Sequence, residues 1–284
     1  GSSGATDGAF LFIRKRKNGQ PWLSKRGDWL IMKKDKGHLE LKDVVVEFNG
    51  FKAIDDFSFS VKKGELRCLI GPNGAGKTTA LDLICGKIRP KSGEVTFEGL
   101  WIDDMEEHEI AWAGIGRKFQ IPSVFQELTV RENLEVAHSK NNGVLANVLQ
   151  FGRGEETDGL EKLVELVGLQ DELKTTAGHL SHGQTQWLEI SLLLAQAPQL
   201  ILMDEPTAGM TVQETKKTAE LFNRLKGRHT LVVVEHDMGF VKEIGEDISV
   251  MHQGTMLAEG SVNEIEQNQA VRDAYLGSGG ISGA

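Results

Sequence analysis

A glycine-rich segment at residues 71–79 places the strongest constraint on the fold of this chain. It reads Gly-Pro-Asn-Gly-Ala-Gly-Lys-Thr-Thr and joins an apolar run at residues 66–70 to a helix-like run at residues 80–85. A strand, a glycine loop and a helix in this order predict a phosphate-binding loop. Glycine lets backbone N–H groups turn toward a polyphosphate without Cβ clashes. The residues that we expect to bind a nucleotide here are Gly71, Asn73, Gly74, Ala75, Gly76, Lys77, Thr78 and Thr79.

The residues that end this loop have side chains suited to a nucleoside triphosphate. Lys77 can neutralise the β and γ oxygens, and the Thr78 hydroxyl can take one coordination position on Mg²⁺. The helix that starts near Thr78 adds the positive end of its dipole. The alternative is a surface turn with a solvated lysine, since the chain contains 33 glycines. The flanking strand and helix favour the phosphate loop.

Two adjacent carboxylates follow a second apolar strand, at residues 200–206, which read Leu-Ile-Leu-Met-Asp-Glu-Pro. We expect Asp204 to contact Mg²⁺ through water, because this ion keeps most of its hydration shell. Glu205 points the other way and can polarise the water that attacks the γ-phosphate. A strand-end Asp-Glu pair by itself is commonly a solvated cap. Its combination with the phosphate loop favours a catalytic role.

The order of apolar runs predicts an α/β fold. A mostly parallel sheet forms a P-loop NTPase core, with an N-terminal antiparallel β subdomain and an inserted helical subdomain. We expect a helix from about Val212 to Leu225 and helical texture from about Val130 to Gly178. The expected strands are Leu39–Leu41, Val44–Phe48, Phe57–Val61, the run at 66–70, Glu94–Phe97, Leu200–Met203 and Leu231–Val234.

The charge and hydropathy of the chain indicate which kinds of partner it can bind. The formal net charge of −9 argues against general affinity for nucleic acid, although residues 1–37 carry nine Lys or Arg against three Asp. No apolar run approaches the length that spans a bilayer, so we expect any membrane association to be peripheral. Cys68 and Cys85 lie in apolar segments, which predicts buried thiols and a reducing compartment.

The sequence of residues 1–37 does not predict a fold. The opening Gly-Ser-Ser-Gly resembles an expression-tag remnant, and a basic extension follows it. Runs at residues 10–13, 22–23 and 29–32 could form strands around the hairpin signal at residues 18–19, with no evident packing partner. A solvated tail and a segment that touches an anionic membrane surface are both open.

A pentapeptide at residues 180–184, Leu-Ser-His-Gly-Gln, precedes a helical run and has capping-box spacing between Ser181 and Gln184. An ordinary helix N-terminus would account for it locally. It also resembles the signature of ATP-binding cassette (ABC) ATPases, which usually reads Leu-Ser-Gly-Gly-Gln, and it lies just ahead of the Asp204-Glu205 strand as in that family.

Three further landmarks of this family occur in order. Phe48 resembles the aromatic residue that stacks on adenine, with Phe51 as the alternative. Gln120 resembles the glutamine that touches Mg²⁺ and senses the membrane partner, and His236 resembles the histidine that reaches the γ-phosphate. Each alone could be structural. The resemblance covers residues 39–277, so we expect an ABC ATPase domain at 38–277, with a helical subdomain inserted at about 121–190 and a tail at 278–284.

The resemblance implies a cofactor set and an assembly. ATP and Mg²⁺ would bind between two ATPase subunits, a homodimer or a pair with a sister subunit, with Ser181, Gly183 and Gln184 serving the ATP of the neighbour. Transmembrane permease subunits would hold this peripheral subunit on the cytoplasmic face of the inner membrane. A periplasmic solute-binding protein would act only indirectly. ATP closes the dimer in that family, and hydrolysis reopens it.

Two residues depart from the usual sequence pattern of the family and indicate a smaller group within it. His182 replaces the first signature glycine, and Thr211 stands where the family usually has aspartate. A helical first-turn position would tolerate His182, whose imidazole could contact phosphate or be a passive surface residue. Together with the tail at residues 274–277, Ala-Tyr-Leu-Gly, these motifs resemble the urea-importer ATPase within the branched-chain amino acid importer group.

Two other function classes remain open at this stage. A soluble, nucleotide-switched ABC protein of DNA repair or translation usually carries a coiled-coil insert, zinc-binding cysteine pairs or two cassettes. This chain has one cassette and two isolated cysteines. A small-molecule kinase would share only the phosphate loop and would leave Ser181–Gln184 and His236 unexplained.

Overall fold

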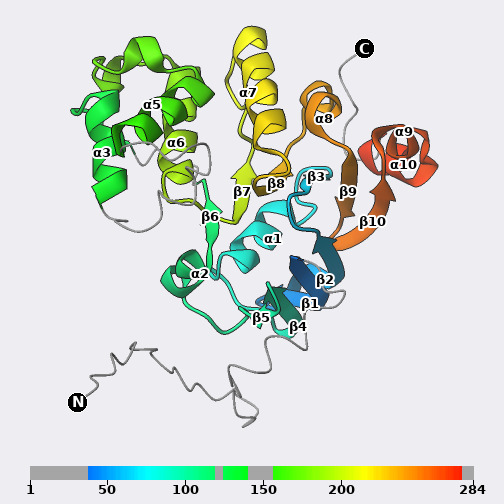
Figure 1. Cartoon of the computed structure of the whole chain (residues 1–284). Coiled ribbons are helices and arrows are strands. Elements are labelled where there is room, and N and C mark those ends of the chain that lie inside the picture. Colours follow the sequence, from blue (N-terminus) through cyan, green and yellow to red (C-terminus); the bar gives the residue numbers. More distant parts are fainter. Residues whose placement is uncertain (1–37, 119–123, 140–155, 277–284) are drawn as a thin grey trace, which may run out of the picture. The chain divides into compact units, whose positions relative to one another are not determined.

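A six-stranded sheet forms the centre of the computed structural model, which describes residues 38–118, 124–139 and 156–276 (Figure 1). Its strand order is β10-β9-β3-β8-β7-β6, and every neighbouring pair except the β9–β10 hairpin is parallel. The predicted mostly parallel sheet is therefore confirmed. Its strands are β3 (Leu66–Ile70), β6 (Ile115–Arg117), β7 (Leu200–Asp204), β8 (Thr230–Val234), β9 (Asp247–His252) and β10 (Thr255–Gly260).

Strands β3, β7 and β8 at the centre of this sheet are buried on both faces, which explains why they are nearly continuous apolar runs. Successive side chains of a strand point to opposite faces. Leu200 and Leu202 of β7 therefore join one hydrophobic cluster, while Ile201 and Met203 join the other. The first cluster lies against the N-terminal sheet and the second lies under the C-terminal and inserted helices.

The N-terminal sheet has the strand order β2-β1-β4-β5 and is antiparallel, as predicted. The prediction of two short strands at 39–41 and 44–48 was wrong, because β1 is continuous. Asp43 takes a left-handed conformation (φ 48°) at a bulge, and its N–H donates to Ser58 Oγ at 3.0 Å. The bulge accommodates the polar residues without ending the strand. These strands are β1 (Leu39–Phe48), β2 (Phe51–Val61), β4 (Ser92–Phe97) and β5 (Leu100–Trp101).

The helices around the two sheets form groups, each made of segments that are neighbours in the sequence. Helix α1 (Lys77–Ile84) packs between the two sheets, and α2 (Glu107–Ala113) follows the N-terminal sheet. The other C-terminal helices are α7 (Val212–Leu225), α8 (Met238–Ile244), α9 (Val262–Gln267) and α10 (Gln269–Leu276). Helix α7 has the bounds that the sequence predicted, and its N-cap Thr211 accepts a hydrogen bond from Glu214 N–H.

The inserted helices gather beside one edge of the central sheet (Figure 1). They are α3 (Val130–Ser139), α5 (Glu156–Val167), the short 3₁₀ turns Gln170–Glu172 and Ala177–His179, and α6 (His182–Leu194). The predicted apolar stripe of α5 is buried at Leu163, Val164 and Val167. Helix α6 continues past the boundary predicted near residue 190. The expected strands within residues 5–37 and the tail at 278–284 lie outside the described residues.

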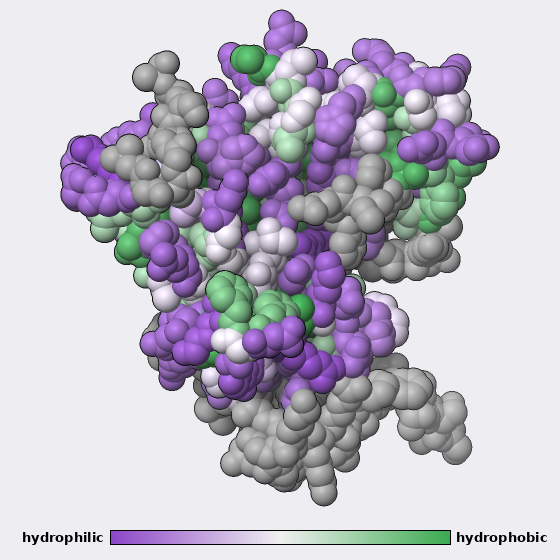
Figure 2. Space-filling view, turned by 180° about the vertical axis from the view of Figure 1, so that it is seen from behind, coloured by the Kyte–Doolittle hydropathy of each residue, from purple (hydrophilic) through white to green (hydrophobic). Residues whose placement is uncertain are grey.

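Figure 2 shows mainly hydrophilic residues on one face of the molecule, with hydrophobic residues in separate groups. Across the described ranges, no helix has the length and apolar character that a membrane crossing requires. Cys68 and Cys85 are both buried and free, as predicted, and burial raises the pKa of Cys68 to about 12.

Candidate nucleotide site

Three neighbouring parallel strands end at one edge of the central sheet. Strand β3 pairs with β8, and β8 pairs with β7. The phosphate loop follows β3, Asp204-Glu205 ends β7, and His236 follows β8. Because the carboxyl ends of parallel strands meet at one edge, residues from three distant segments converge there.

The loop after β3 requires glycine at its turns. Gly71, Gly74 and Gly76 have φ values of 151°, 77° and 104°. A Cβ on Gly71 would lie 2.1 Å from the carbonyl oxygen of Met251, and one on Gly76 would lie 2.8 Å from that of Ala53. The loop therefore packs closely against β9 and β2 and leaves no space for a side chain at these two positions.

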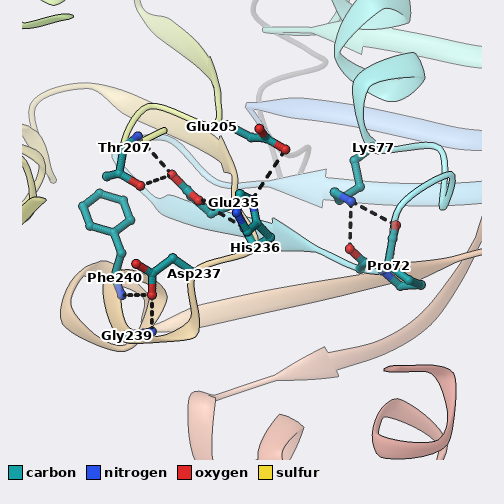
Figure 3. A network of polar contacts seen from close by, with 10 residues as sticks. Pro72, Lys77, Glu205, Thr207, Glu235, His236, Asp237, Gly239 and Phe240 are labelled. Atoms are coloured by element: carbon teal, nitrogen blue, oxygen red, sulfur yellow. Dashed lines mark hydrogen bonds and ion pairs between the residues drawn. The ribbon is translucent and has the colours of Figure 1, made fainter. Parts of the chain in front are cut away.

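Lys77 begins α1 and folds back over the loop (Figure 3). Its Nζ donates to the carbonyl oxygens of Gly71 at 2.7 Å and Pro72 at 3.1 Å. Burial lowers the pKa of this ammonium, while Glu205 and Asp204 oppose that shift. The N-cap residue Gly76 offers no side chain to the first turn of α1. This helix end therefore suits an anion, which the neighbouring ammonium could also bind.

Asp204 and Thr78 lie close enough to share a cation. The Thr78 hydroxyl hydrogen-bonds the Asp204 carboxylate, and both groups are hard oxygen ligands. Asp204 Oδ2 is buried and accepts no hydrogen bond from the described part of the chain. Burial raises the pKa of Asp204, and the Arg117 guanidinium, whose Nη2 is 3.5 Å from Oδ2, opposes that rise. The Thr78 hydroxyl and the Asp204 carboxylate are therefore suitable ligands for Mg²⁺.

Arg117 was not predicted as part of the site. It ends β6, lies beside Asp204 and also pairs with Asp82 of α1. Its neighbour Lys118 is buried, and Lys118 Nζ lies 3.4 Å from Glu189 Oε2 of α6. The only sequence signal for Arg117 and Lys118 was their position just before the expected Gln120. Gln120 itself lies outside the described residues.

Glu205 and His236 face each other across β7 and β8 (Figure 3). His236 Nδ1 lies 3.5 Å from Glu205 Oε1, and both side chains are partly open to solvent. Glu205 has φ 47°, a left-handed conformation that is costly outside glycine, and its N–H donates to the Val234 carbonyl at 2.9 Å. The backbone is thus held in an unusual conformation at the residue predicted to activate water.

Glu235 organises the loops behind this pair and was not predicted. Its side chain is 1% exposed, and it accepts hydrogen bonds from Thr207 N–H at 3.1 Å and Thr207 Oγ1 at 2.7 Å. It also accepts one from the N–H of His236 at 3.1 Å. A buried carboxylate needs such donors, so Glu235 fixes the backbone next to His236 and after Glu205.

Phe48 and Phe51 form a cross-strand pair at the tip of the β1–β2 hairpin. They are 46% and 69% exposed, so both rings have a face open to solvent, and Phe48 is the more buried of the two. Strand β2 reaches the phosphate loop at Ala53, two residues beyond Phe51. Both aromatic rings remain candidates for stacking on a base.

The signature residues lie at the N-terminus of α6. Ser181 is the N-cap: its Oγ accepts from Gln184 N–H at 3.2 Å, and Gln184 Oε1 accepts from Ser181 N–H at 2.9 Å. The predicted capping box is therefore confirmed. Gly183 is buried beside Glu214, a residue that the sequence analysis did not single out.

Comparison with known proteins agrees with this geometry. A family model described as ABC transporter matches residues 54–208. The high-affinity branched-chain amino acid transport ATP-binding protein LivG of Salmonella typhimurium is 34% identical over 248 residues, covering 84% of this chain and 97% of LivG. The chain belongs to the ABC transporter family. The ABC transporter ATP-binding subunit recognised from the sequence motifs is confirmed, and ATP hydrolysis is the activity of this domain.

Two solved structures of ATP-binding cassettes are similar to this ABC domain. The ADP conformation of MJ1267, an ATP-binding cassette of an ABC transporter, has a TM-score of 0.74 and 32% identity, covering 86% of this chain and all of MJ1267. A dimeric post-hydrolysis state of the cassette MJ0796, bound to ADP and phosphate, has a TM-score of 0.65 and 25% identity over 79% of this chain and 98% of MJ0796. The predicted fold class is confirmed.

The two departures from the ABC pattern are accommodated locally. His182 is the first residue of α6 and is helical, so the position does not need glycine. Its Nε2 donates to the Ala208 carbonyl at 2.9 Å, toward the chain's own loop. Thr211 is the N-cap of α7, a role that threonine fills well. His182 thus joins the signature helix to the loop before α7, and Thr211 caps α7 itself.

The C-terminal helix of this ABC domain reaches the phosphate loop. Tyr275 of α10 is a residue that the sequence analysis used only as a subfamily marker. Burial raises its pKa to about 12, and a hydrogen bond with the Gly71 backbone opposes that shift. A short motif near the end of the chain therefore packs beside the first glycine of the loop.

Proposed function

We propose that this chain is the ATP-hydrolysing subunit that energises solute import through a membrane transporter. The observation that carries the proposal is the convergence of Lys77, Asp204-Glu205 and His236 at one sheet edge. That convergence occurs in a chain that resembles a transport ATP-binding protein over 84% of its length. Fold alone would not be enough, because function depends on the site.

The residues at this edge divide the chemistry among them. Lys77 binds the β- and γ-phosphates once it leaves the Gly71 and Pro72 carbonyls, and the N–H groups of the loop from Asn73 to Thr79 bind the remaining oxygens. Glu205 orients and polarises the attacking water, while His236 reaches the γ-phosphate from the next strand. Phe48, or its cross-strand neighbour Phe51, stacks on adenine.

Thr78, Asp204 and Gln120 are the residues that would hold Mg²⁺. The hydroxyl-to-carboxylate contact between Thr78 and Asp204 supports this assignment, as does the buried Oδ2 of Asp204. Bound Mg²⁺ would neutralise charge on the β- and γ-phosphate oxygens. The Arg117 guanidinium, 3.5 Å from Asp204 Oδ2, helps to hold this carboxylate in place.

Ser181, Gly183 and Gln184 serve the ATP of a second subunit, either another copy of this chain or a sister ATPase. Ser181 caps a 13-residue helix, and a helix N-terminus attracts an anion. The dimeric MJ0796 structure supports the pairing of two such cassettes. ATP thus joins the phosphate loop of one subunit to the signature of the other.

The remaining partners follow from the transporter assignment. Transmembrane permease subunits hold the chain peripherally on the cytoplasmic face of the inner membrane, and a periplasmic solute-binding protein acts only through them. The acidic net charge of −9 disfavours nucleic acid, which weighs against a role in DNA repair or translation. The solute never touches this chain.

Two solute classes are proposed. Similarity to LivG favours branched-chain amino acids. The Leu-Ser-His-Gly-Gln signature and the Ala-Tyr-Leu-Gly tail favour urea and short amides, by resemblance. The discriminating experiment is uptake of labelled urea, acetamide and leucine by the complete transporter in vesicles. Uptake should require ATP and disappear with Glu205→Gln in this subunit. A complete transporter that imports none of these solutes would overturn the importer proposal.

A further inference from the structure

A carboxylate lies over the first turn of the signature helix. Ser181 Oγ donates a hydrogen bond to Glu214 Oε1 at 3.1 Å, although the two residues are 33 positions apart. A Cβ on Gly183 would lie 2.3 Å from the same oxygen and 2.4 Å from the carboxyl carbon. A side chain at position 183 would therefore displace the Glu214 carboxylate. The carboxylate holds the hydroxyl of the signature serine.

The other oxygen of Glu214 is held by its own helix. Thr211 N–H and Thr211 Oγ1 each donate to Glu214 Oε2, both at 2.9 Å. This capping box fixes the start of α7 and leaves Oε1 directed at Ser181. The Thr211 backbone hydrogen bond is the main reason why the pKa of Glu214 is lowered. Glu214 is thus ionised at neutral pH and positioned by α7.

The same helix end is where the proposed function places the γ-phosphate of the partner subunit's ATP. Two anions at one helix N-terminus repel each other, and Ser181 cannot donate its single proton to both. We propose that Glu214 is a positioning residue that sets how strongly the signature binds the partner's ATP, by holding Ser181 until the phosphate displaces it. This inference rests on the proposed function.

Another capping box, at the start of α9, provides a matched control. Ser261 caps α9, and its N–H and Oγ each donate to Glu264 Oε2 at 2.8 Å. The pKa of Glu264 is also lowered, mainly by the Ser261 backbone hydrogen bond. Glu264 therefore repeats the capping role of Glu214 at a helix that carries no signature residue.

The experiment measures ATP-dependent dimerisation of the full chain by light scattering, in a Glu205→Gln background that prevents turnover. Glu214→Gln keeps an amide oxygen for Thr211 but removes the charge. We expect it to lower the ATP concentration at the dimerisation midpoint about three- to tenfold, as loss of one partly screened like-charge contact implies. Glu264→Gln should leave the midpoint unchanged. The difference between the two variants should shrink at 0.5 M NaCl, since salt screens charge repulsion.

Several results would overturn the inference. They are equal midpoints for Glu214→Gln and Glu264→Gln, a higher midpoint for Glu214→Gln at unchanged melting temperature, or a difference that salt does not change. If Glu214→Gln proves unstable, Glu214→Ala answers the same question, and its midpoint should also fall although the cap is lost. A parent chain that stays monomeric at every ATP concentration would instead overturn the proposed pairing of two copies, and this inference with it.

Discussion

The N-termini of α1 and α6 are both suited to anions, but the chain treats them differently. At α1 the N-cap is Gly76, and the Lys77 ammonium folds back onto the loop before the helix. At α6, Ser181 and Gln184 cap the helix and the Glu214 carboxylate lies beside Gly183. The first end is left for a ligand, whereas the second is already satisfied by the chain's own polar groups. We therefore expect nucleotide to bind at α1 before α6 of a second subunit joins it.

The two ends also differ in burial. Behind the phosphate loop, Asp204 and Glu235 are buried carboxylates: Asp204 Oδ2 lies 3.5 Å from Arg117 Nη2, and Glu235 accepts a hydrogen bond from Thr207. Around the signature, Ser181, His182 and Thr211 are exposed. Loss of a hydrogen bond costs more where water cannot replace it. The two regions should respond differently to substitution, and the four tests below proceed from the largest expected effect to the smallest.

Glu205→Gln should lower the rate of ATP hydrolysis about 100-fold or more, because general-base assistance typically contributes that much. ATP affinity should be unchanged, since the amide keeps the shape of the side chain. Phosphate release and calorimetric ATP binding measure the two effects. Glu264→Gln is the control. Turnover near that of the unmodified chain would exclude Glu205 as the base.

Lys77→Ala should weaken ATP binding about 10- to 100-fold, as loss of a charge-assisted hydrogen bond to phosphate implies. Calorimetry with a non-hydrolysable analogue measures it. Lys87→Ala is the control, because Lys87 follows the opposite end of α1, where its Nζ lies 3.6 Å from Asp82 Oδ1. Equal affinities for the two variants would mean that the α1 end does not bind phosphate.

Thr207→Val should lower the free energy of unfolding by about 1–3 kcal/mol, because it removes one donor from the buried Glu235 carboxylate. Hydrolysis should also fall, since Glu235 fixes the backbone of His236. Urea denaturation measures stability. Thr255→Val is the control, because the exposed Thr255 hydroxyl donates only to the His252 carbonyl. Equal stability for both variants would contradict the contrast in burial.

Ser181→Ala should cost about 1 kcal/mol of stability, the usual cost of losing an exposed N-cap. Ser261→Ala removes the same kind of cap from α9 and should cost a similar amount. Only Ser181→Ala should also raise the ATP concentration needed for dimerisation, while ATP binding to the monomer stays unchanged. If both variants dimerise alike, the signature hydroxyl does not contact the partner's nucleotide.

Much of the fold could be predicted because the signals are local. The bounds of α7, the strand at 66–70 and the buried stripe of α5 follow from apolar period and caps. The break predicted within β1 was wrong because a bulge at Asp43 absorbs polar residues that read as a turn. Strands β9 and β10, which complete the sheet, were not predicted, because the pairing of β9 with β3 and of β10 with β9 is a property of the assembled sheet.

The sequence by itself determined the phosphate loop, the Asp204-Glu205 strand end, the Ser181 capping box and the family, since each is a short segment with its own conformational rule. Only the tertiary structure decided that Arg117 pairs with Asp204, that Glu235 fixes the backbone beside His236, and that Glu214 holds Ser181. The reason is physical: these contacts join residues from separate elements. They exist only after the sheet and helices α6 and α7 have packed, and no spacing along the chain encodes them.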